Sequence, residues 1–410
     1  MKQVVRKTAF GGVAMKELSQ IASAVRASTT LAIDAMFKQM KADGVDVIGF
    51  GAGEPDFPTP DNIKEAGITA IRENFTRYTP TPGIPELRQA VCARLKADCG
   101  LDYVPAQIVV ASGAKHALYA ALHALVNPGD EIIVPAPFWV TYFEMVRMIG
   151  GIPVIVSADE SEHFKITPER LAASVTPKTK AILLNNPSNP TGMVYSREEL
   201  QALAAVCVEK DIYIIADEIY YRLVYDGRSF TSIASLGKDV KERTIVINGV
   251  SKSYAMTGWR IGYAAAPEQI ARVMANYLSH STAAPCSIAQ KAAVEALNGP
   301  QDTVEAMRKA FETRRNHLVE RMNRIPGVSC LKPEGAFYVM MNLRELLGKT
   351  LHGTPIHDAD DFADVFLKQG LVAVVPGNGF GAPEFVRWSY ATSMENIDAG
   401  LDRLEKFLAE

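Results

Sequence analysis

The stretch from Ser251 to Tyr263 reads SKSYAMTGWRIGY and follows a β-rich run at Thr244–Ile247. Lys252 therefore stands between two serines at the end of an expected strand, where partial shielding from water lowers the pKa of an amine and favours Schiff-base chemistry. Arg260 lies eight residues further on and can return to the same pocket, where its planar guanidinium suits a phosphate. A lone lysine is typical of a surface, but the whole string predicts a reactive lysine beside an anion site.

Similar β-rich runs precede this stretch and alternate with helical stretches. The runs are Ile108–Ala111, Glu131–Val134, Pro153–Val156, Ala181–Leu184 and Tyr213–Ala216. Between them, Lys115–Leu125 and Arg197–Glu209 have helical spacing. This alternation predicts an α/β fold with a mostly parallel sheet covered on both faces. Ligands bind such sheets beyond the carboxyl ends of the strands, so polar motifs directly after strands are the candidates for chemistry.

A break at Gly299–Pro300 divides the chain, whose 410 residues fit two lobes of unequal size. We expect an arm at residues 1–16, a segment at 17–50 that is helical over Glu17–Asp43 and joins the small domain, a large domain at 51–300 and a small α+β domain at 301–410. The elements expected in the small domain are helices at Thr303–Arg324, Asp360–Gln369 and Glu395–Leu408, and strands at Ala336–Met341 and Val372–Val375.

Composition argues against several classes of function. The net charge is −3 with no long like-charge run, so a nucleic-acid partner is not expected. No apolar run reaches the ~18 residues needed to span a bilayer. The five cysteines are odd in number and form no CxxC pair, which predicts free thiols in a reducing compartment, the cytoplasm.

Two motif-like segments do not support a site of their own. Gly49–Gly53 looks like part of a dinucleotide fingerprint, but Glu54 and Pro55 follow it and no helix is expected to open there. His352 and His357 lie in a Gly/Pro loop, with a spacing unlike that of a zinc set. Neither a dinucleotide nor a metal site is expected.

Three further motifs follow strands. Ser112–Lys115 reads SGAK and opens a helix, whose exposed backbone N–H groups and dipole form a ready phosphate seat. Asn185–Gly192 reads NNPSNPTG, a density of Asn and Pro that forces a tight loop. Asp217, in the string ADEIY, ends a strand, and a carboxylate in a partly buried cleft needs a cationic partner. Each motif alone also has a plainer interpretation: a capping turn, a loop turn and an N-cap aspartate.

Together these strings resemble the class I aminotransferases, which are fold-type-I pyridoxal-5′-phosphate (PLP) enzymes. The resemblance runs from about Glu17 to the C-terminus and is strongest to the prokaryotic-type (Ib) aspartate aminotransferases. It implies a fold-type-I PLP transferase with a large domain, built on a mostly parallel seven-stranded sheet, and a smaller α+β domain. It also implies a homodimer with shared active sites.

The resemblance assigns roles around the cofactor. Lys252 would hold PLP as a Schiff base and act as general acid–base, while Asp217 would keep the pyridine nitrogen protonated. Tyr220 and Asn189 would hydrogen-bond the phenolic oxygen, and Trp139 would stack on the ring. The residues expected around the phosphate are Gly113, Ala114, Lys115, Ser251, Arg260 and, from the neighbouring subunit, Tyr78. Some relatives carry a serine where this chain has Gly249, and Ser251 would partly replace it.

The substrate-side residues follow from the same resemblance. Arg387 would grip the α-carboxylate with its bidentate guanidinium, and the Gly53 backbone would lie near the substrate together with Trp139 and Asn189. Lys115 would bind the distal carboxylate of a dicarboxylate. Alternatively, Lys115 faces solvent on the first helical turn, where a cation is mildly unfavourable.

The expected reaction is transamination, with aspartate and 2-oxoglutarate giving oxaloacetate and glutamate. Aminotransferases for aromatic amino acids, alanine, kynurenine or prephenate remain alternatives, as does a PLP-dependent carbon–sulfur β-lyase on the same fold. A non-enzymatic regulator is a third class, but it would need a DNA-binding extension before the region that resembles the family.

Overall fold

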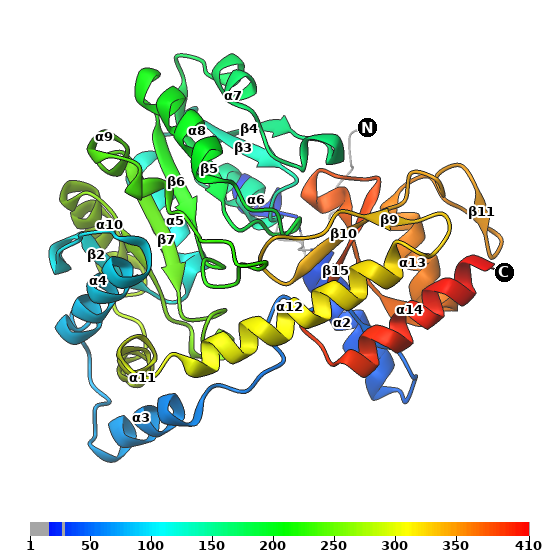
Figure 1. The fold of residues 1–410 in the computed structure, drawn as a ribbon. Helices are drawn as coiled ribbons and strands as arrows, with labels where there is room; N and C mark the ends of the chain where they lie inside the picture. Colours follow the sequence, from blue (N-terminus) through cyan, green and yellow to red (C-terminus); the bar gives the residue numbers. More distant parts are fainter. Residues whose placement is uncertain (1–15, 27–28, 410) are drawn as a thin grey trace.

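The computed structural model describes residues 16–26 and 29–409. A seven-stranded sheet forms the core of the lobe that is drawn mostly in cyan and green (Figure 1). The strand order is β2-β8-β7-β6-β5-β3-β4. The strands are β2 (Ile108–Ala111), β3 (Glu131–Ala136), β4 (Ile152–Ser157), β5 (Thr179–Asn185), β6 (Tyr213–Asp217), β7 (Thr244–Gly249) and β8 (Gly262–Ala265). Only β8 runs antiparallel to its neighbours, so the predicted mostly parallel sheet is confirmed.

Helices cover both faces of this sheet, as the nearly continuous burial of its central strands requires. Ile132 and Val134 pack with α5 (Ala114–Leu125), α6 (Thr141–Met148) and α10 (Glu268–Ser281). Ile133 and the neighbouring β5 and β6 side chains of the opposite face pack with α7 (Pro168–Ser174) and α8 (Arg197–Glu209). On that second face, α4 (Pro85–Cys99) and α11 (Ser287–Asn298) cover the β2–β8 end, and α3 (Asp61–Arg72) packs on α11.

The C-terminal unit begins with the long helix α12 (Asp302–Met322). Its sheet has the order β14-β15-β10-β9, with β9 (Ser329–Cys330), β10 (Tyr338–Asn342), β14 (Val375–Pro376) and β15 (Phe385–Ser389). Helices α13 (Ala359–Gln369) and α14 (Met394–Ala409) complete it, with a small hairpin of β11 (Thr350–Leu351) and β12 (Thr354–Pro355).

The N-terminal segment lies against this C-terminal unit. Strand β1 (Ile48–Gly49) pairs in parallel with β13 (Val372–Ala373), and α2 (Thr29–Ala42) packs beside them (Figure 1). The chain therefore passes from one unit to the other at residues 50–60, directly beside the ends of the large sheet. The domain boundaries at 50/51 and 300/301 stay a prediction.

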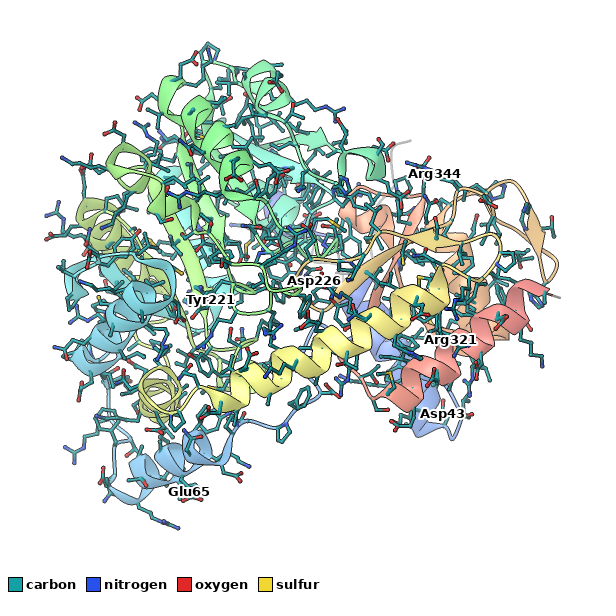
Figure 2. All side chains as sticks on the ribbon, in the orientation of Figure 1. Asp43, Glu65, Tyr221, Asp226, Arg321 and Arg344 are labelled. Atoms are coloured by element: carbon teal, nitrogen blue, oxygen red, sulfur yellow. The ribbon has the colours of Figure 1, made fainter. Side chains whose placement is uncertain are left out.

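An ion pair between a buried arginine and an exposed carboxylate ties α12 to the loop that follows β6. Arg315, on α12, is fully buried and donates to both carboxylate oxygens of Asp226 at 2.8 Å. Figure 2 shows Asp226 beside this helix. The guanidinium holds the pKa of Asp226 down to about 2. This contact fixes the start of the C-terminal unit against the segment that carries Tyr220.

The helices and strands differ from the sequence prediction at several elements. The expected single helix over Glu17–Asp43 is replaced by α1 (Gln20–Ser23) and α2, with non-helical residues after Ala24. The expected strand Val372–Val375 is two strands, because β13 pairs with β1 whereas β14 pairs with β15. The strands that were not predicted individually are β1, β8, β9, β11, β12 and β15. No helix of the described residues is long and apolar enough to cross a membrane.

Candidate active site

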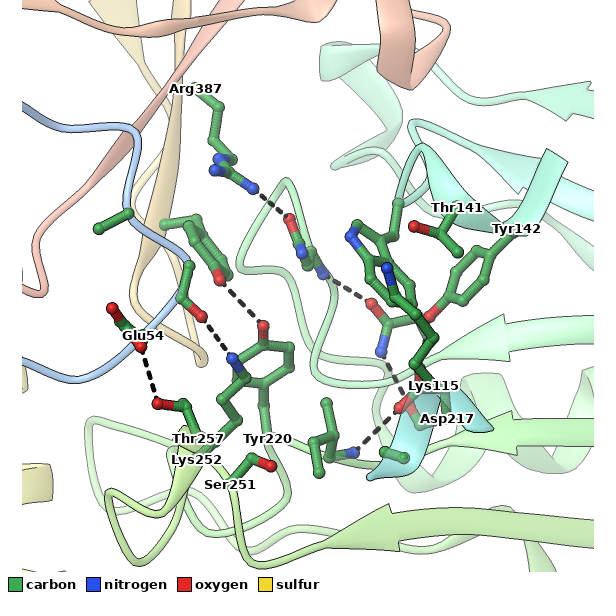
Figure 3. A pocket seen from close by; sticks show the side chains of 18 of the residues that line it. Glu54, Lys115, Thr141, Tyr142, Asp217, Tyr220, Ser251, Lys252, Thr257 and Arg387 are labelled. Atoms are coloured by element: carbon green, nitrogen blue, oxygen red, sulfur yellow. Dashed lines mark hydrogen bonds between the residues drawn. The ribbon is translucent and has the colours of Figure 1, made fainter. Parts of the chain in front are cut away.

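A cavity of about 380 Å³ lies where the carboxyl ends of β5, β6 and β7 and the start of α5 face β10 and β15 (Figure 3). It brings together most of the residues predicted from the sequence. These are Gly53, Ala114, Lys115, Trp139, Asn189, Asp217, Tyr220, Ser251, Lys252, Arg260 and Arg387. Gly113 lies directly behind the wall, whereas Tyr78 lies outside the cavity and is fully exposed in this single chain.

Lys252 follows β7 and points into the cavity. Its Nζ donates a hydrogen bond to the backbone carbonyl of Gly53, which lies in the segment at residues 50–60 that joins the two units (Figure 3). Desolvation lowers the pKa of Lys252 to about 8, although the charge of Glu54 opposes the shift. A larger fraction of this amine is therefore neutral, and nucleophilic, near neutral pH than for an ordinary lysine.

Asp217 is the last residue of β6 and is buried on the cavity floor. One carboxylate oxygen accepts a hydrogen bond from the Tyr142 hydroxyl at 2.7 Å, and the other accepts from the Ile219 N–H at 3.2 Å. Desolvation raises the pKa of Asp217 to about 6 even though both hydrogen bonds oppose the shift. The charge of Lys252 also opposes the shift, but no cation pairs directly with this buried carboxylate among the described residues.

Arg387 enters the cavity from β15 and is fully buried. It donates to Asn189 Oδ1 at 3.0 Å and to the Gly51 carbonyl at 2.9 Å, while its Nε has no partner among the described residues. Its guanidinium carbon lies 4.4 Å from the ring centroid of Tyr338 and 5.2 Å from that of Phe380. Burial lowers the pKa of Arg387, because desolvation disfavours its charged form. A bound anion would stabilise this buried guanidinium.

The α5 N-terminus forms the opposite wall. Gly113 has φ +91°, and a Cβ there would collide with the Arg260 guanidinium, so this turn requires glycine. Arg260 donates to the Thr257 carbonyl at 2.7 Å. The Nζ of Lys115 lies over the Trp139 ring, 4.8 Å from its centroid, and desolvation together with the charge of Arg260 lowers the pKa of Lys115.

The charges of the cavity are not balanced by the protein. Among the described residues, no carboxylate forms an ion pair with any of its four cations, Lys115, Lys252, Arg260 and Arg387. The cavity holds two carboxylates, Glu54 and Asp217, and Glu54 Oε2 accepts from Thr257 Oγ1 at 2.7 Å. Such an arrangement suits a ligand that brings several anionic groups to the walls and one cationic group to Asp217.

The structure adds two tyrosines that sequence reasoning missed. Tyr142 lies on the first turn of α6, three residues after Trp139, and holds Asp217. Tyr338 begins β10, and its hydroxyl oxygen lies 2.9 Å from that of Tyr220. The helical spacing from Trp139 could have indicated Tyr142, whereas Tyr338 depends on a strand pairing that the sequence does not reveal.

The structure also explains why glycine, and not serine, stands at position 249. A Cβ at Gly249 would lie 2.9 Å from both the Gly262 Cα and the Ile261 carbonyl oxygen, so no serine side chain fits there without a backbone shift. Ser251, two residues on, is buried and lines the cavity. The close packing of β7 on β8 is therefore the physical reason for glycine at this corner.

Comparisons with known proteins agree with this geometry. The family model described as aminotransferase class I and II matches residues 45–404. The chain is 49% identical to an aspartate aminotransferase of Geobacillus stearothermophilus, with 96% of this chain and 99% of the relative covered. It is 47% identical to an aspartate/prephenate aminotransferase of Cereibacter sphaeroides, at 96% and 99% coverage.

Solved structures of aspartate aminotransferases are also similar. The enzyme from Rhizobium meliloti superimposes with a TM-score of 0.93 at 41% identity, and 96% of this chain and 99% of that chain are covered. The Thermus thermophilus enzyme with maleate superimposes with a TM-score of 0.91 at 41% identity, at 96% and 100% coverage.

Proposed function

The chain belongs to the class I and II aminotransferases, and we propose that it transfers the amino group of aspartate to 2-oxoglutarate with PLP held on Lys252. The observation that carries the proposal is the unbalanced charge of the cavity: among the described residues, its four cations pair with no carboxylate and the buried Asp217 pairs directly with no cation. A dicarboxylic amino acid and PLP together would supply the missing groups.

The residues present fit PLP. The Asp217 carboxylate suits a protonated pyridine nitrogen, whose charge would offset its desolvation. The Lys252 amine, with its pKa lowered to about 8, suits the aldehyde. The α5 N-terminus and Arg260 meet at Gly113, where a side chain would fill the space, and this cradle suits the phosphate.

The protein groups divide the work of transamination. Bound PLP supplies an electron-withdrawing ring that accepts the electron pair of the substrate's Cα–H bond. Lys252 takes the proton from Cα and returns it as general acid, a task for which a pKa near 8 is well matched. Arg387 orients the α-carboxylate, and Trp139 covers one side of the cavity against water.

Lys115 is the residue that would select a dicarboxylic substrate. It stands on the wall opposite Arg387, with its ammonium over Trp139 and no carboxylate paired to it within the described part of the chain. A distal carboxylate would pair with this ammonium and offset its desolvation. Relatives named for aspartate support the same substrate.

Prephenate is a second candidate amino acceptor. Some relatives carry this name, and a second cavity of about 750 Å³ shares Lys115, Thr141 and Arg260 with the first. A bulky acceptor could extend into this space if the flexible lysine stem moved aside.

A homodimer with shared sites is also part of the proposal. Tyr78 is a large aromatic residue that is fully exposed in the single chain, and burial against a partner would remove this surface from water. The partner's active site would then receive it at the phosphate. The cytoplasmic location stays a prediction.

The test is a panel of half-reactions. Purified protein loaded with PLP is mixed with single amino acids, and the absorbance change from the aldehyde to the amine form of the cofactor is followed. Aspartate and glutamate should react fastest and release their 2-oxo acids. Pyruvate and ammonia from a cysteine conjugate, without need of a 2-oxo acid, would instead indicate the β-lyase.

A further inference from the structure

Tyr338 links the two halves of the active site, and none of the functions above uses it. The side chain is buried between the C-terminal unit and the large sheet. Its hydroxyl oxygen lies 2.9 Å from the Tyr220 hydroxyl, and its ring lies against the Arg387 guanidinium. One residue thus contacts both the group expected at the cofactor's phenolic oxygen and the group expected at the substrate's α-carboxylate.

The strand pairing explains the contact with Arg387. Strands β10 and β15 are antiparallel, with Met340 opposite Arg387 and Tyr338 opposite Ser389. Side chains two residues apart on a strand share a face, so Tyr338 and Arg387 are diagonal neighbours on the cavity face. The ring then provides a polarisable surface for a buried guanidinium whose Nε has no partner among the described residues.

The hydroxyl contact explains how Tyr220 would be oriented. A tyrosine hydroxyl has one hydrogen to donate, and it can accept others. If Tyr338 donates to Tyr220, the hydrogen of Tyr220 is left for a ligand oxygen, and the donated bond polarises Tyr220 into a stronger donor. The rings of the two tyrosines meet edge to face, with centroids 5.7 Å apart, which restricts the swing of Tyr220.

We propose that Tyr338 is a positioning residue that acts on the cofactor through the Tyr220 hydroxyl and on the substrate carboxylate through Arg387. The inference rests on the proposed function. It predicts two separable effects, because the hydroxyl serves Tyr220 and the ring serves Arg387.

The first experiment is a pH titration of the visible absorbance of bound PLP in a double-mutant cycle. A hydrogen bond donated to the phenolic oxygen stabilises the form that has lost its proton, so weakening Tyr220 raises the titration midpoint. Tyr338→Phe should raise the midpoint by about half a pKa unit, less than Tyr220→Phe does. The double variant should titrate like Tyr220→Phe alone, because Tyr338 acts through Tyr220.

Other groups that face Tyr220 must stay in place during the titration. They come from β6, the loop after β7, β15 and α6, and they are Asp217, Lys252, Arg387 and Tyr142. The matched control is Tyr263→Phe, which removes another buried hydroxyl, one that has no partner among the described residues. Its midpoint should equal that of the wild type.

The second experiment separates the ring from the hydroxyl. Tyr338→Leu should raise the KM for aspartate about tenfold, whereas Tyr338→Phe keeps the ring and should leave KM within about twofold. An unshifted midpoint in Tyr338→Phe, or additive shifts in the double variant, would overturn the link through Tyr220. A protein that binds no PLP on Lys252 would overturn the proposed function first, and the two failures are therefore distinguishable.

Discussion

Replacing Lys115 with alanine should lower kcat/KM for aspartate and leave alanine nearly unchanged. The ammonium lies over the Trp139 ring at 4.8 Å from its centroid and pairs with no carboxylate in the described chain, so a ligand carboxylate is its natural partner. A charge-assisted hydrogen bond contributes about 1.5–3 kcal/mol. Because Lys115 as a residue stays exposed in the single chain, solvent screening favours the lower half of this range.

An interaction of about 1.5–2 kcal/mol corresponds to a loss of about 10- to 30-fold in kcat/KM for aspartate. The assay is the half-reaction of the PLP-loaded protein with aspartate and with alanine, measured under single-turnover conditions. Lys115→Met should behave like Lys115→Ala, because methionine keeps most of the stem but not the charge. Lys165→Met is the matched control: Lys165 also lies near an aromatic ring, that of Tyr195, but pairs with Glu199 outside the cavity.

The pattern across substrates decides the role of Lys115. A loss confined to aspartate and glutamate supports recognition of the distal carboxylate. An equal loss on alanine, together with weaker PLP binding, would refute it and place Lys115 at the cofactor phosphate instead.

Three further predictions concern Lys252, Asp217 and Tyr78. Uptake of PLP by the cofactor-free protein should speed up with pH and level off above about 8, since the neutral amine reacts and the pKa of Lys252 is lowered to about 8; a rate that still rises steeply towards pH 10 would contradict this. Asp217→Asn should stabilise the cofactor-free protein at pH 8. The pKa of Asp217 is raised from 3.8 to about 6 in the folded chain. Its ionisation therefore lowers the free energy of unfolding by up to about 3 kcal/mol above pH 6, and this loss disappears below pH 4. Equal melting temperatures of the two proteins at pH 8 would argue against a desolvated carboxylate. Mixing inactive Tyr78→Ala and Lys252→Ala proteins should restore about a quarter of the wild-type activity, because half of the dimers would be hybrids with one complete site; no recovery after subunit exchange would show that Tyr78 does not serve the partner.

The sequence was most informative where chemistry follows directly after a strand. Lys252, Asp217 and Asn189 each follow a β-rich run, and the carboxyl ends of those strands meet at one edge of the sheet, so their convergence was predictable. The six β-rich runs all fall within strands of the central sheet. The positions of these strands were predictable because each is a short hydrophobic run bounded by turn residues, a local pattern in the sequence.

Features that depend on contacts across the chain were not predictable. Strand β8 is only Gly262–Ala265, too short and too poor in β-branched residues to stand out, and it forms because both neighbours pair with it. The strand expected at Val372–Val375 is divided because its first half pairs with β1 and its second half pairs with β15. Tyr338 becomes a site residue only through the register of β10 on β15, which no local pattern encodes.

The attachment of the cofactor to Lys252 is the central claim, and reduction with borohydride tests it most directly. Borohydride treatment of the PLP-loaded protein, followed by proteolysis and mass spectrometry, fixes the cofactor to the lysine that holds it. The label should lie on the peptide that contains Ser251 to Arg260, at Lys252, and Lys252→Ala protein should give no specific label. A label on Lys115 or on any other lysine, with Lys252 unmodified, would contradict the account.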